Sequence, residues 1–146
     1  TDENLDNIIS ESIAYMEKRF SKNIQFNQQS NLVEKTLKIN KVLIIWVIEN
    51  ICKNAADAMK GDGLIRINCT EYEKNIQILI SDTGSGIDKS IVKSIFMPGI
   101  TSKKRGWGLG LSLVKRIIED HGGKIKIEKN KNMAGTKSLI NFEYNA

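Results

Sequence analysis

The order of hydrophobic periodicities along the chain constrains its fold more than any other feature. Three segments carry apolar residues at helical spacing, and the segments between them alternate apolar with polar residues. Helices are expected at Asp6–Phe20, Lys41–Lys60 and Gly108–Asp120, and strands around Ile24 and Phe26, near Thr36–Ile39, and at Leu64–Thr70, Asn75–Ser81, Lys124–Lys129 and Thr136–Tyr144. This order predicts a two-layer α/β sandwich, with three main helices on one face of a mixed sheet and a polar outer face.

Turn and cap residues punctuate these segments. Asn40 is a suitable N-cap for the second helix, and Gly61 and Gly63 are expected to end it. Turns are expected at Gln28–Asn31, Glu71–Lys74 and Asn130–Gly135, and Asp82–Arg105 is expected to form a long loop that contains a short helix near Lys89–Ile95. A loop of that length inside a compact domain is usually functional.

Composition and charge exclude several classes of protein. The 146 residues suit one domain, residues 1–146, and no apolar stretch approaches the roughly 20 residues that span a bilayer. The net charge of +5 fits an anionic ligand, but aromatic residues make up only 6% of the chain and do not interleave with the basic run, which argues against nucleic-acid binding. Cys52 and Cys69 lack metal-binding spacing and are expected to be buried thiols, as in a reducing compartment.

Three polar residues on the second helix form a candidate site. Asn50, Asn54 and Asp57 are spaced i, i+4 and i+7, so they share one helix face. A carboxamide oxygen is a hard ligand of the kind that Mg²⁺ accepts. The spacing alone is equally compatible with a polar stripe on the helix surface.

Two glycine-rich stretches form further candidates. Asp82 ends an apolar strand just before Gly84 and Gly86, where its carboxylate can accept a hydrogen bond from a ligand amino group or simply form a turn. Gly106, Gly108 and Gly110 precede the third helix, whose free N–H groups attract anions, and a basic run lies just upstream. These three glycines are also compatible with a hinge.

The only histidine is not expected to be catalytic. His121 lies at the end of the third helix, before two glycines, where an imidazolium interacts favourably with the helix dipole. Capping or packing is therefore the expected role. No Ser/His/Asp or Cys/His arrangement can be assembled.

Four segments in order resemble the GHKL ATPases. They are ENICKNAADAM (Glu49–Met59), DTGSGID (Asp82–Asp88), IFMPGITSK (Ile95–Lys103) and GWGLGLSLVKRIIEDHGG (Gly106–Gly123), which look like the N, G1, F and G2 boxes. The F box is similar to the catalytic ATP-binding domain of bacterial sensor histidine kinases, more than to gyrase, Hsp90 or MutL. The resemblance implies the Bergerat fold with an ATP lid loop, and ATP bound with Mg²⁺.

The resemblance also implies roles for individual residues. Asp82 would bind the adenine amino group, and Asn54 would hold Mg²⁺. Asn50 would support the phosphates or the metal. Gly84 and Gly86 would give adenine access to the site, and Phe96 would anchor the lid. Lys103, Lys104 and Arg105 would contact the phosphates and, together with Asn50, take part in catalysis. Gly106, Gly108 and Gly110 would form the lid hinge, and the remaining ATP contacts would come from Ile87, Thr101, Ser102, Leu109 and Leu111.

The implied function is the catalytic domain of a two-component sensor kinase. It would bind ATP and ADP, and transfer the γ-phosphoryl group to a histidine on a separate dimerisation domain, for relay to a response regulator. That dimerisation domain is absent from this sequence, so the chain is expected to be a piece of a larger protein. The parent is expected to be a homodimer and the isolated domain a monomer. The domain is expected in the cytoplasm, with a parent anchored in the inner membrane.

Two departures from the family pattern bear on the mechanism. Asp57 stands where many sensor kinases have a Lys or Arg that reaches phosphate, which leaves that task to the lid or to Lys53. Gyrase-like relatives have a glutamate base where this chain has Asn50, and Glu49 is one residue early, about 100° away on a helix. Two other functions stay open: a module that holds ATP without transferring it, and a serine kinase of the anti-sigma type.

Overall fold

The computed structural model describes residues 2–31, 36–83, 107–129 and 135–143. In this part of the chain the helices are α1 (Leu5–Arg19), α2 (Lys41–Ala58) and α3 (Trp107–Asp120). The strands are β1 (Asp2–Glu3), β2 (Ile24–Ser30), β3 (Leu37–Lys38), β4 (Gly63–Glu71), β5 (Asn75–Asp82), β6 (Gly123–Lys129) and β7 (Thr136–Glu143).

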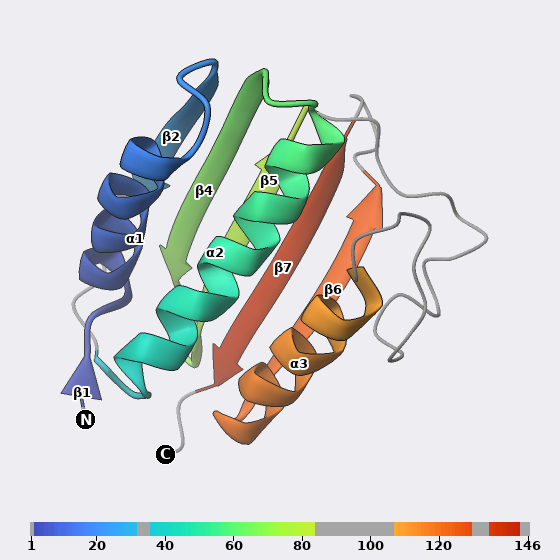
Figure 1. The fold of residues 1–146 in the computed structure, drawn as a ribbon. Coiled ribbons are helices and arrows are strands. Elements are labelled where there is room, and N and C mark those ends of the chain that lie inside the picture. Colours follow the sequence, from blue (N-terminus) through green and yellow to red (C-terminus); the bar gives the residue numbers. More distant parts are fainter. Residues whose placement is uncertain (1, 32–35, 84–106, 130–134, 144–146) are drawn as a thin grey trace.

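The main sheet has five strands in the order β2-β4-β5-β7-β6. β2 runs parallel to β4, and the other neighbouring pairs are antiparallel. The three helices cover one face of this sheet, with α2 between α1 and α3 (Figure 1). The predicted fold class, a two-layer α/β sandwich on a mixed sheet, is confirmed.

The core lies between the helices and the sheet because each element buries one face. On β5, Ile76, Ile78 and Ile80 alternate with half-buried residues and are at most 2% exposed. On α2 the buried side chains recur at helical spacing: Ile44, Val47, Ile48, Ile51, Cys52 and Ala55. The outer face of the sheet is mostly polar, as predicted. Leu64, Leu79 and Leu139 are the apolar exceptions on the described strands, and the last two lie opposite each other in the ladder.

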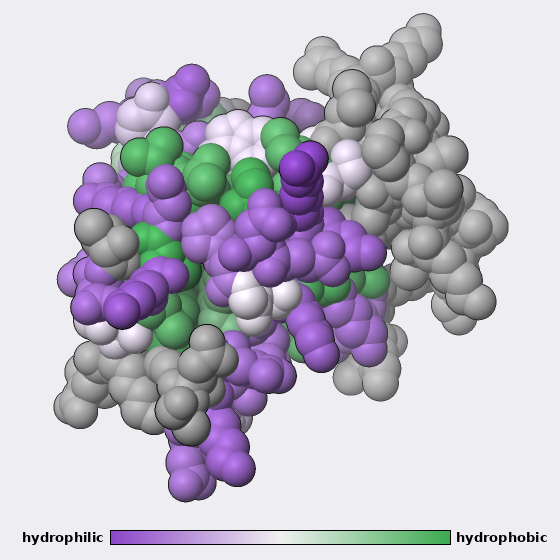
Figure 2. Space-filling view, turned by 90° about the horizontal axis from the view of Figure 1, so that it is seen from below, coloured by the Kyte–Doolittle hydropathy of each residue, from purple (hydrophilic) through white to green (hydrophobic). Residues whose placement is uncertain are grey.

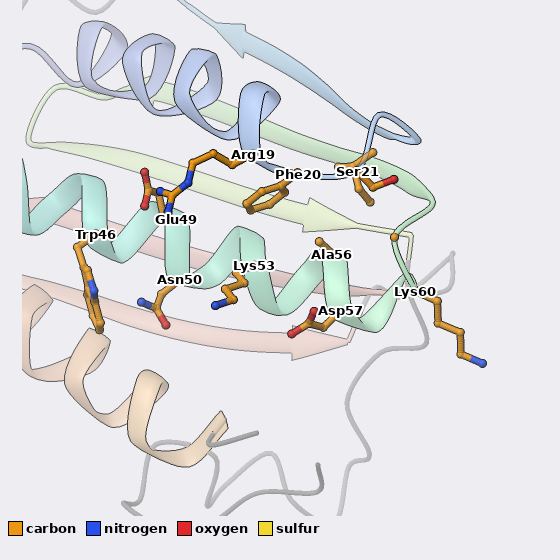
Figure 3. A pocket seen from close by; sticks show the side chains of 12 residues that line it. Arg19, Phe20, Ser21, Trp46, Glu49, Asn50, Lys53, Ala56, Asp57 and Lys60 are labelled. Carbon is orange, nitrogen blue, oxygen red and sulfur yellow. The ribbon is translucent and has the colours of Figure 1, made fainter. Parts of the chain in front are cut away.

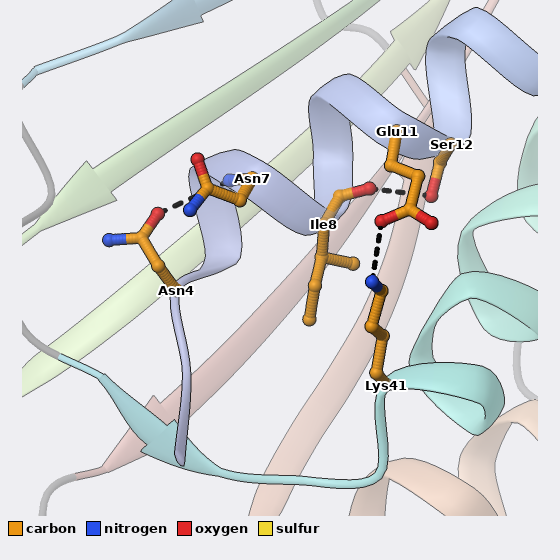
Figure 4. A network of polar contacts seen from close by, with 6 residues as sticks. All are labelled: Asn4, Asn7, Ile8, Glu11, Ser12 and Lys41. Atoms are coloured by element: carbon orange, nitrogen blue, oxygen red, sulfur yellow. Dashed lines mark hydrogen bonds and ion pairs between the residues drawn. The ribbon is translucent and has the colours of Figure 1, made fainter. Parts of the chain in front are cut away.

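Polar contacts define where α1 and α2 begin. The side chain of Asn4 caps α1 by accepting from the N–H of Asn7 at 3.2 Å. Lys41 Nζ, in the first turn of α2, lies 2.8 Å from Glu11 Oε2 and links the two helices (Figure 4). The end of the molecule where α2 begins shows hydrophobic patches separated by hydrophilic side chains (Figure 2).

The predicted boundaries of α2 are close to those observed. Asn40 is its N-cap, because the side chain accepts from the N–H of Leu43 at 3.1 Å. The helix ends two residues earlier than predicted. Lys60 and Gly61 leave it with φ of 55° and 78°, the left-handed geometry typical of helix ends.

The predicted turn at Gln28–Asn31 is wrong for residues 28–30, because β2 extends to Ser30. Ile24 to Ser30 pair in parallel with Gly63 to Cys69 of β4. An edge strand exposed to solvent needs no apolar alternation, so its polar side chains gave no strand signal. The short strand near Thr36–Ile39 shrinks to Leu37–Lys38, and the helix expected at Lys89–Ile95 lies outside the described residues.

Among the described residues, no helix combines the length and the apolar character that a membrane crossing requires.

Both cysteines are buried free thiols, as predicted; Cys52 is 0% exposed and Cys69 1%. Burial raises the pKa of the Cys69 thiol to about 12, and the charge of Asp6 and a hydrogen bond with it act in the same direction. Burial also raises the pKa of Cys52, with smaller contributions from the charges of Asp82 and Glu49.

These shifts predict a loss of stability at alkaline pH. In the unfolded chain a cysteine thiol loses its proton at about pH 8.5, whereas in the folded chain the Cys52 and Cys69 thiols keep their protons to higher pH. Above about pH 8.5 the unfolded state therefore binds fewer protons, and the free energy of unfolding falls with pH by at most about 1.4 kcal/mol per unit for each thiol. Urea unfolding at about pH 8 and pH 10 should show a smaller fall for Cys69→Ala than for the natural chain. An identical pH dependence in the two proteins would contradict the assignment.

Candidate functional site

The polar residues of α2 lie on its accessible side. Asn50, Asn54 and Asp57 are each half-buried. Asn50 and Asp57 project, with the exposed Lys53, from one side of the helix (Figure 3). The predicted sharing of one helix face is thus borne out for these two residues, and Asn54 turns toward the interior of the sandwich.

A small cavity brings Asn54 and Asp82 together. Asn54 comes from α2, Asp82 from the end of β5, and Thr136 and Ser138 from the start of β7. The remaining lining residues are apolar: Ile51, Ala55, Ala58, Ile80, Leu111 and Ile127. The cavity has a volume of about 20 Å³, which is enough for about one water molecule. A few convergent polar groups in an apolar wall are typical of a small-molecule site.

The carboxylate of Asp82 is held by the neighbouring strand. The side chain is 7% exposed, and its Oδ1 accepts from the backbone N–H of Thr136 at 3.3 Å. Gly135 packs directly on it with φ of 111°, and a Cβ at this position would overlap the backbone carbonyl of Asp82. Only a glycine therefore allows β7 to approach this carboxylate.

The carboxamide of Asn54 has an unsatisfied donor. Its Nδ2 is buried and has no hydrogen-bond partner among the residues that the structure describes. A buried polar group without a partner costs about 1–3 kcal/mol, so this donor calls for a further partner, such as an ordered water or a bound ligand. Rotation of the carboxamide presents either its nitrogen to a phosphate oxygen or its oxygen to a cation.

These residues fit Mg²⁺ only in combination with a ligand. Within the described ranges no three His, Cys, Asp or Glu side chains gather as a metal site. Mg²⁺ commonly uses one or two protein oxygens, with waters and substrate phosphates completing its shell. The donor set around Asn54 is of that kind.

The start of α3 approaches α2 closely at Asn50. A Cβ on Gly110 would lie 2.9 Å from Asn50 Oδ1. The third glycine of the GWGLG stretch therefore allows α3 to pack closely against Asn50 of α2. It also places the first turn of α3, whose N–H groups lack helical partners, next to the polar side of α2.

A second hollow lies on the other side of α2, toward α1. This groove of about 580 Å³ lies between the end of α1 and the outer face of α2. Arg19 and Glu49 face each other across it (Figure 3). Glu49 thus lies toward α1, away from the cavity that holds Asn54 and Asp82. The groove is also lined by Asn50, Lys53 and Asp57, and neither Asn50 nor Asp57 lines the cavity that holds Asn54.

His121 has the predicted capping role, but not as an imidazolium. Its Nδ1 lies 2.7 Å from the carbonyl oxygen of Ile117, and its Nε2 accepts from the backbone N–H of Asn40 at 3.1 Å. A backbone N–H can only donate, so Nε2 carries no proton in this arrangement. The ring is neutral, with its proton on Nδ1.

Many of the predicted site residues lie outside the described part of the chain. These are Gly84, Gly86, Ile87, Phe96, Thr101, Ser102, Lys103, Lys104, Arg105 and Gly106. Gly108 and Leu109 belong to the first turn of α3. Leu111 lines the cavity that holds Asn54 and Asp82.

Sequence reasoning missed Gly135 and Thr136. The sequence predicts Gly135 in a turn and Thr136 at the start of a strand, and gives neither residue a role in the site. The available signal was a glycine at the start of an alternating strand, which often marks a close approach of the backbone. Which residue it approaches depends on the pairing of β7 with β5.

The fold and site define an α/β domain with an amide and a carboxylate over a small pocket, and comparison with known proteins identifies its family. Residues 39–145 match the family of histidine kinase-, DNA gyrase B- and HSP90-like ATPases. The chain belongs to this family. The resemblance to sensor histidine kinase catalytic domains, inferred from the four boxes, is confirmed.

The similar proteins are sensor kinases. The signal transduction histidine-protein kinase AtoS of Escherichia coli (strain K12) is 40% identical over 105 residues, which are 71% of this chain and 17% of AtoS. The C4-dicarboxylate transport sensor protein DctB of Rhizobium meliloti (strain 1021) is 34% identical over 106 residues, again 71% of this chain and 17% of the relative. The chain thus spans about one sixth of the length of these relatives. The nucleotide-free catalytic domain of histidine kinase ThkA has a TM-score of 0.87 at 30% identity, over 98% of this chain and 94% of that domain.

The contact between Gly135 and Asp82 predicts the effect of a single methyl group. Gly135→Ala should destabilise the chain by about 3 kcal/mol or more, because it combines a left-handed φ with overlap on the Asp82 carbonyl. Gly122→Ala is the matched control: its φ is 77°, but no atom lies within 4 Å of an added Cβ. It should cost only about 1 kcal/mol. Urea unfolding of both variants measures the difference, and equal costs would show that the overlap is relieved without strain.

Proposed function

We propose that this chain binds Mg-ATP in the cavity beside Asn54 and Asp82 and is the catalytic domain of a sensor histidine kinase. The observation that carries the proposal is the buried Asn54 Nδ2, which has no partner in the described part of the chain and lies in the same cavity as the Asp82 carboxylate. Membership of an ATPase family and the likeness to the ThkA catalytic domain support it.

Asp82 would recognise the adenine end of the nucleotide. The carboxylate is already oriented by the Thr136 N–H, so it can accept from an exocyclic amino group without further ordering. The apolar wall from Ile51, Ile80 and Leu111 would pack on the ring. The present volume of about 20 Å³ means that this wall has to open to admit adenine.

Asn54, Asn50 and the first turn of α3 would meet the phosphate end. The free N–H groups of that turn suit anionic oxygens, and Gly110 brings them beside Asn50. Asn54 would hold Mg²⁺, which neutralises phosphate charge when it is bound. We extend the same proposal to the lid residues Lys103, Lys104 and Arg105, which the resemblance places near the phosphates.

The position of Glu49 favours transfer over hydrolysis. Its carboxylate faces Arg19 across the groove toward α1, away from the cavity. Asn50, which takes the place of the glutamate of gyrase-like relatives, cannot remove a proton from water. Transfer to a protein side chain needs mainly positioning and charge neutralisation, which this site can supply.

The proposed acceptor is a histidine on a dimerisation domain of the parent protein. His121 does not qualify, because both of its ring nitrogens are engaged between α2 and α3. The proposed recipient of the phosphoryl group is a response regulator; histidine kinase ThkA, 26% identical over 99% of this chain and 42% of that protein (TM-score 0.83), has been solved in complex with response regulator TrrA. A homodimeric parent anchored in the inner membrane, with this domain in the cytoplasm, belongs to the same proposal.

Removing the Asp82 carboxylate should weaken nucleotide binding selectively. Asp82→Ala should lower the affinity for ATP and ADP by about 10- to 100-fold, because a hydrogen bond to a charged group contributes about 1.5–3 kcal/mol. Titration calorimetry with and without Mg²⁺ measures the change. The exposed Asp62→Ala is the control and should bind as the natural chain does. Unchanged affinity in a folded Asp82→Ala protein would refute the adenine assignment.

Phosphoryl transfer should require a second domain. The chain is mixed with the dimerisation domain of its parent and γ-labelled ATP, and acid-labile label on a histidine of that domain is the expected product. Label on a serine would favour the anti-sigma type of kinase. ATP binding without any transfer would favour the module that only holds nucleotide.

A further inference from the structure

His121 joins the two helices that supply the candidate site. It lies directly after α3, and its ring donates from Nδ1 to the carbonyl of Ile117, one turn back in the same helix. Its Nε2 accepts from the backbone N–H of Asn40, the residue that caps α2. The side chain of Asn40 is itself engaged with the N–H of Leu43, so the end of α3 is tied to the cap structure of α2.

This tie lies at the end of α3 opposite to the end that approaches the candidate site. The two helices run in opposite directions (Figure 1). Near the start of α3, Gly110 lies against Asn50, which is in the middle of α2. Asn50 lies ten positions after Asn40, and His121 lies eleven positions after Gly110, or about 15 and 16.5 Å of helix at a rise of about 1.5 Å per residue. The two contacts therefore bracket nearly equal lengths of the two helices.

The packing between the two contacts is apolar and has little direction of its own. On α3 the buried side chains are Leu111, Val114, Ile117 and Ile118. Hydrophobic contact depends on the area buried and not on direction, so it tolerates small axial slides of one helix along the other. A hydrogen bond from a fixed backbone N–H to a ring nitrogen tolerates them poorly.

We infer that His121 is a positioning residue for nucleotide binding. It fixes the axial position of α3 against α2 and thereby keeps the first turn of α3 beside Asn50 and Leu111 in the wall of the cavity. The inference rests on the proposed binding of a nucleotide at that site. His121 contacts no part of the site itself and acts only through the helix that it holds.

Substitution of His121 tests this role. His121→Ala removes both hydrogen bonds and should weaken the binding of ADP or a non-hydrolysable ATP analogue about three- to tenfold. His121→Gln retains an acceptor near the position of Nε2 and should restore affinity to within about twofold of the natural chain. Calorimetric titration is done where unfolding curves show every variant to be fully folded.

A control separates positioning from a general loss of stability. Ile24→Val removes a buried methyl group on β2, at the opposite edge of the sheet from α3 and β6. It should lower the midpoint of thermal unfolding without changing nucleotide affinity. Unchanged affinity in His121→Ala, or an equal loss in Ile24→Val, would overturn the inference.

Hydrogen exchange of the nucleotide-free chain gives a second, independent readout. The amides of residues 111–114, in the half of α3 nearest the site, should exchange at least about threefold faster in His121→Ala than in Ile24→Val. If the natural chain binds no nucleotide, the proposed function fails, and the exchange data still show whether His121 holds α3. Equal exchange in these two variants would refute the tie itself.

Discussion

The packing of α2 against the sheet is the constraint on which the rest of the structure depends. One stripe of this helix, from Ile44 to Ala55, is buried in the core against the sheet, with α1 and α3 on either side, and a helix is too stiff to bury that stripe in more than one orientation. The same rotation therefore turns Asn54 toward the end of β5 and leaves Asn50 and Asp57 on the accessible side. The geometry of the polar groups is thus a consequence of apolar packing.

The second requirement is the close approach of β7 to the end of β5. The ladder pairs Ser81 with Lys137, so the next residues outward, Asp82 and Thr136, meet at the rim of the sheet. Gly135 makes this approach sterically feasible, and the Thr136 N–H orients the carboxylate. A strand register thereby sets the direction of a side chain of the candidate site.

The site retains polarity that the fold does not satisfy. Elsewhere in the described residues, Ser12 donates to the carbonyl of Ile8 and His121 engages both ring nitrogens, whereas Asn68 Oδ1, on the outer face of the sheet, is another buried atom without a partner. Asn54 keeps a buried donor without a partner, at a cost to stability. A ligand that supplied the missing acceptor would regain that cost as binding energy, which links the local instability to the proposed nucleotide.

The helices, the Asn40 cap, the central hairpin and the buried cysteines could be predicted from the sequence, because periodicity and capping are encoded within a few residues. The pair Asn54 and Asp82 was also identified, from motif spacing and resemblance. Three features depended on contacts between distant segments. They are the extension of β2 to Ser30 alongside β4, the close approach of Gly135 to Asp82, and the hydrogen bond that the neutral ring of His121 accepts at the start of α2. The sequence by itself determined the three helices, the strands whose apolar and polar residues alternate, and the buried faces of those elements. Only the tertiary structure decided which strands and helix ends meet, because pairing and close approach are properties of two segments together and leave no periodic signal in either one.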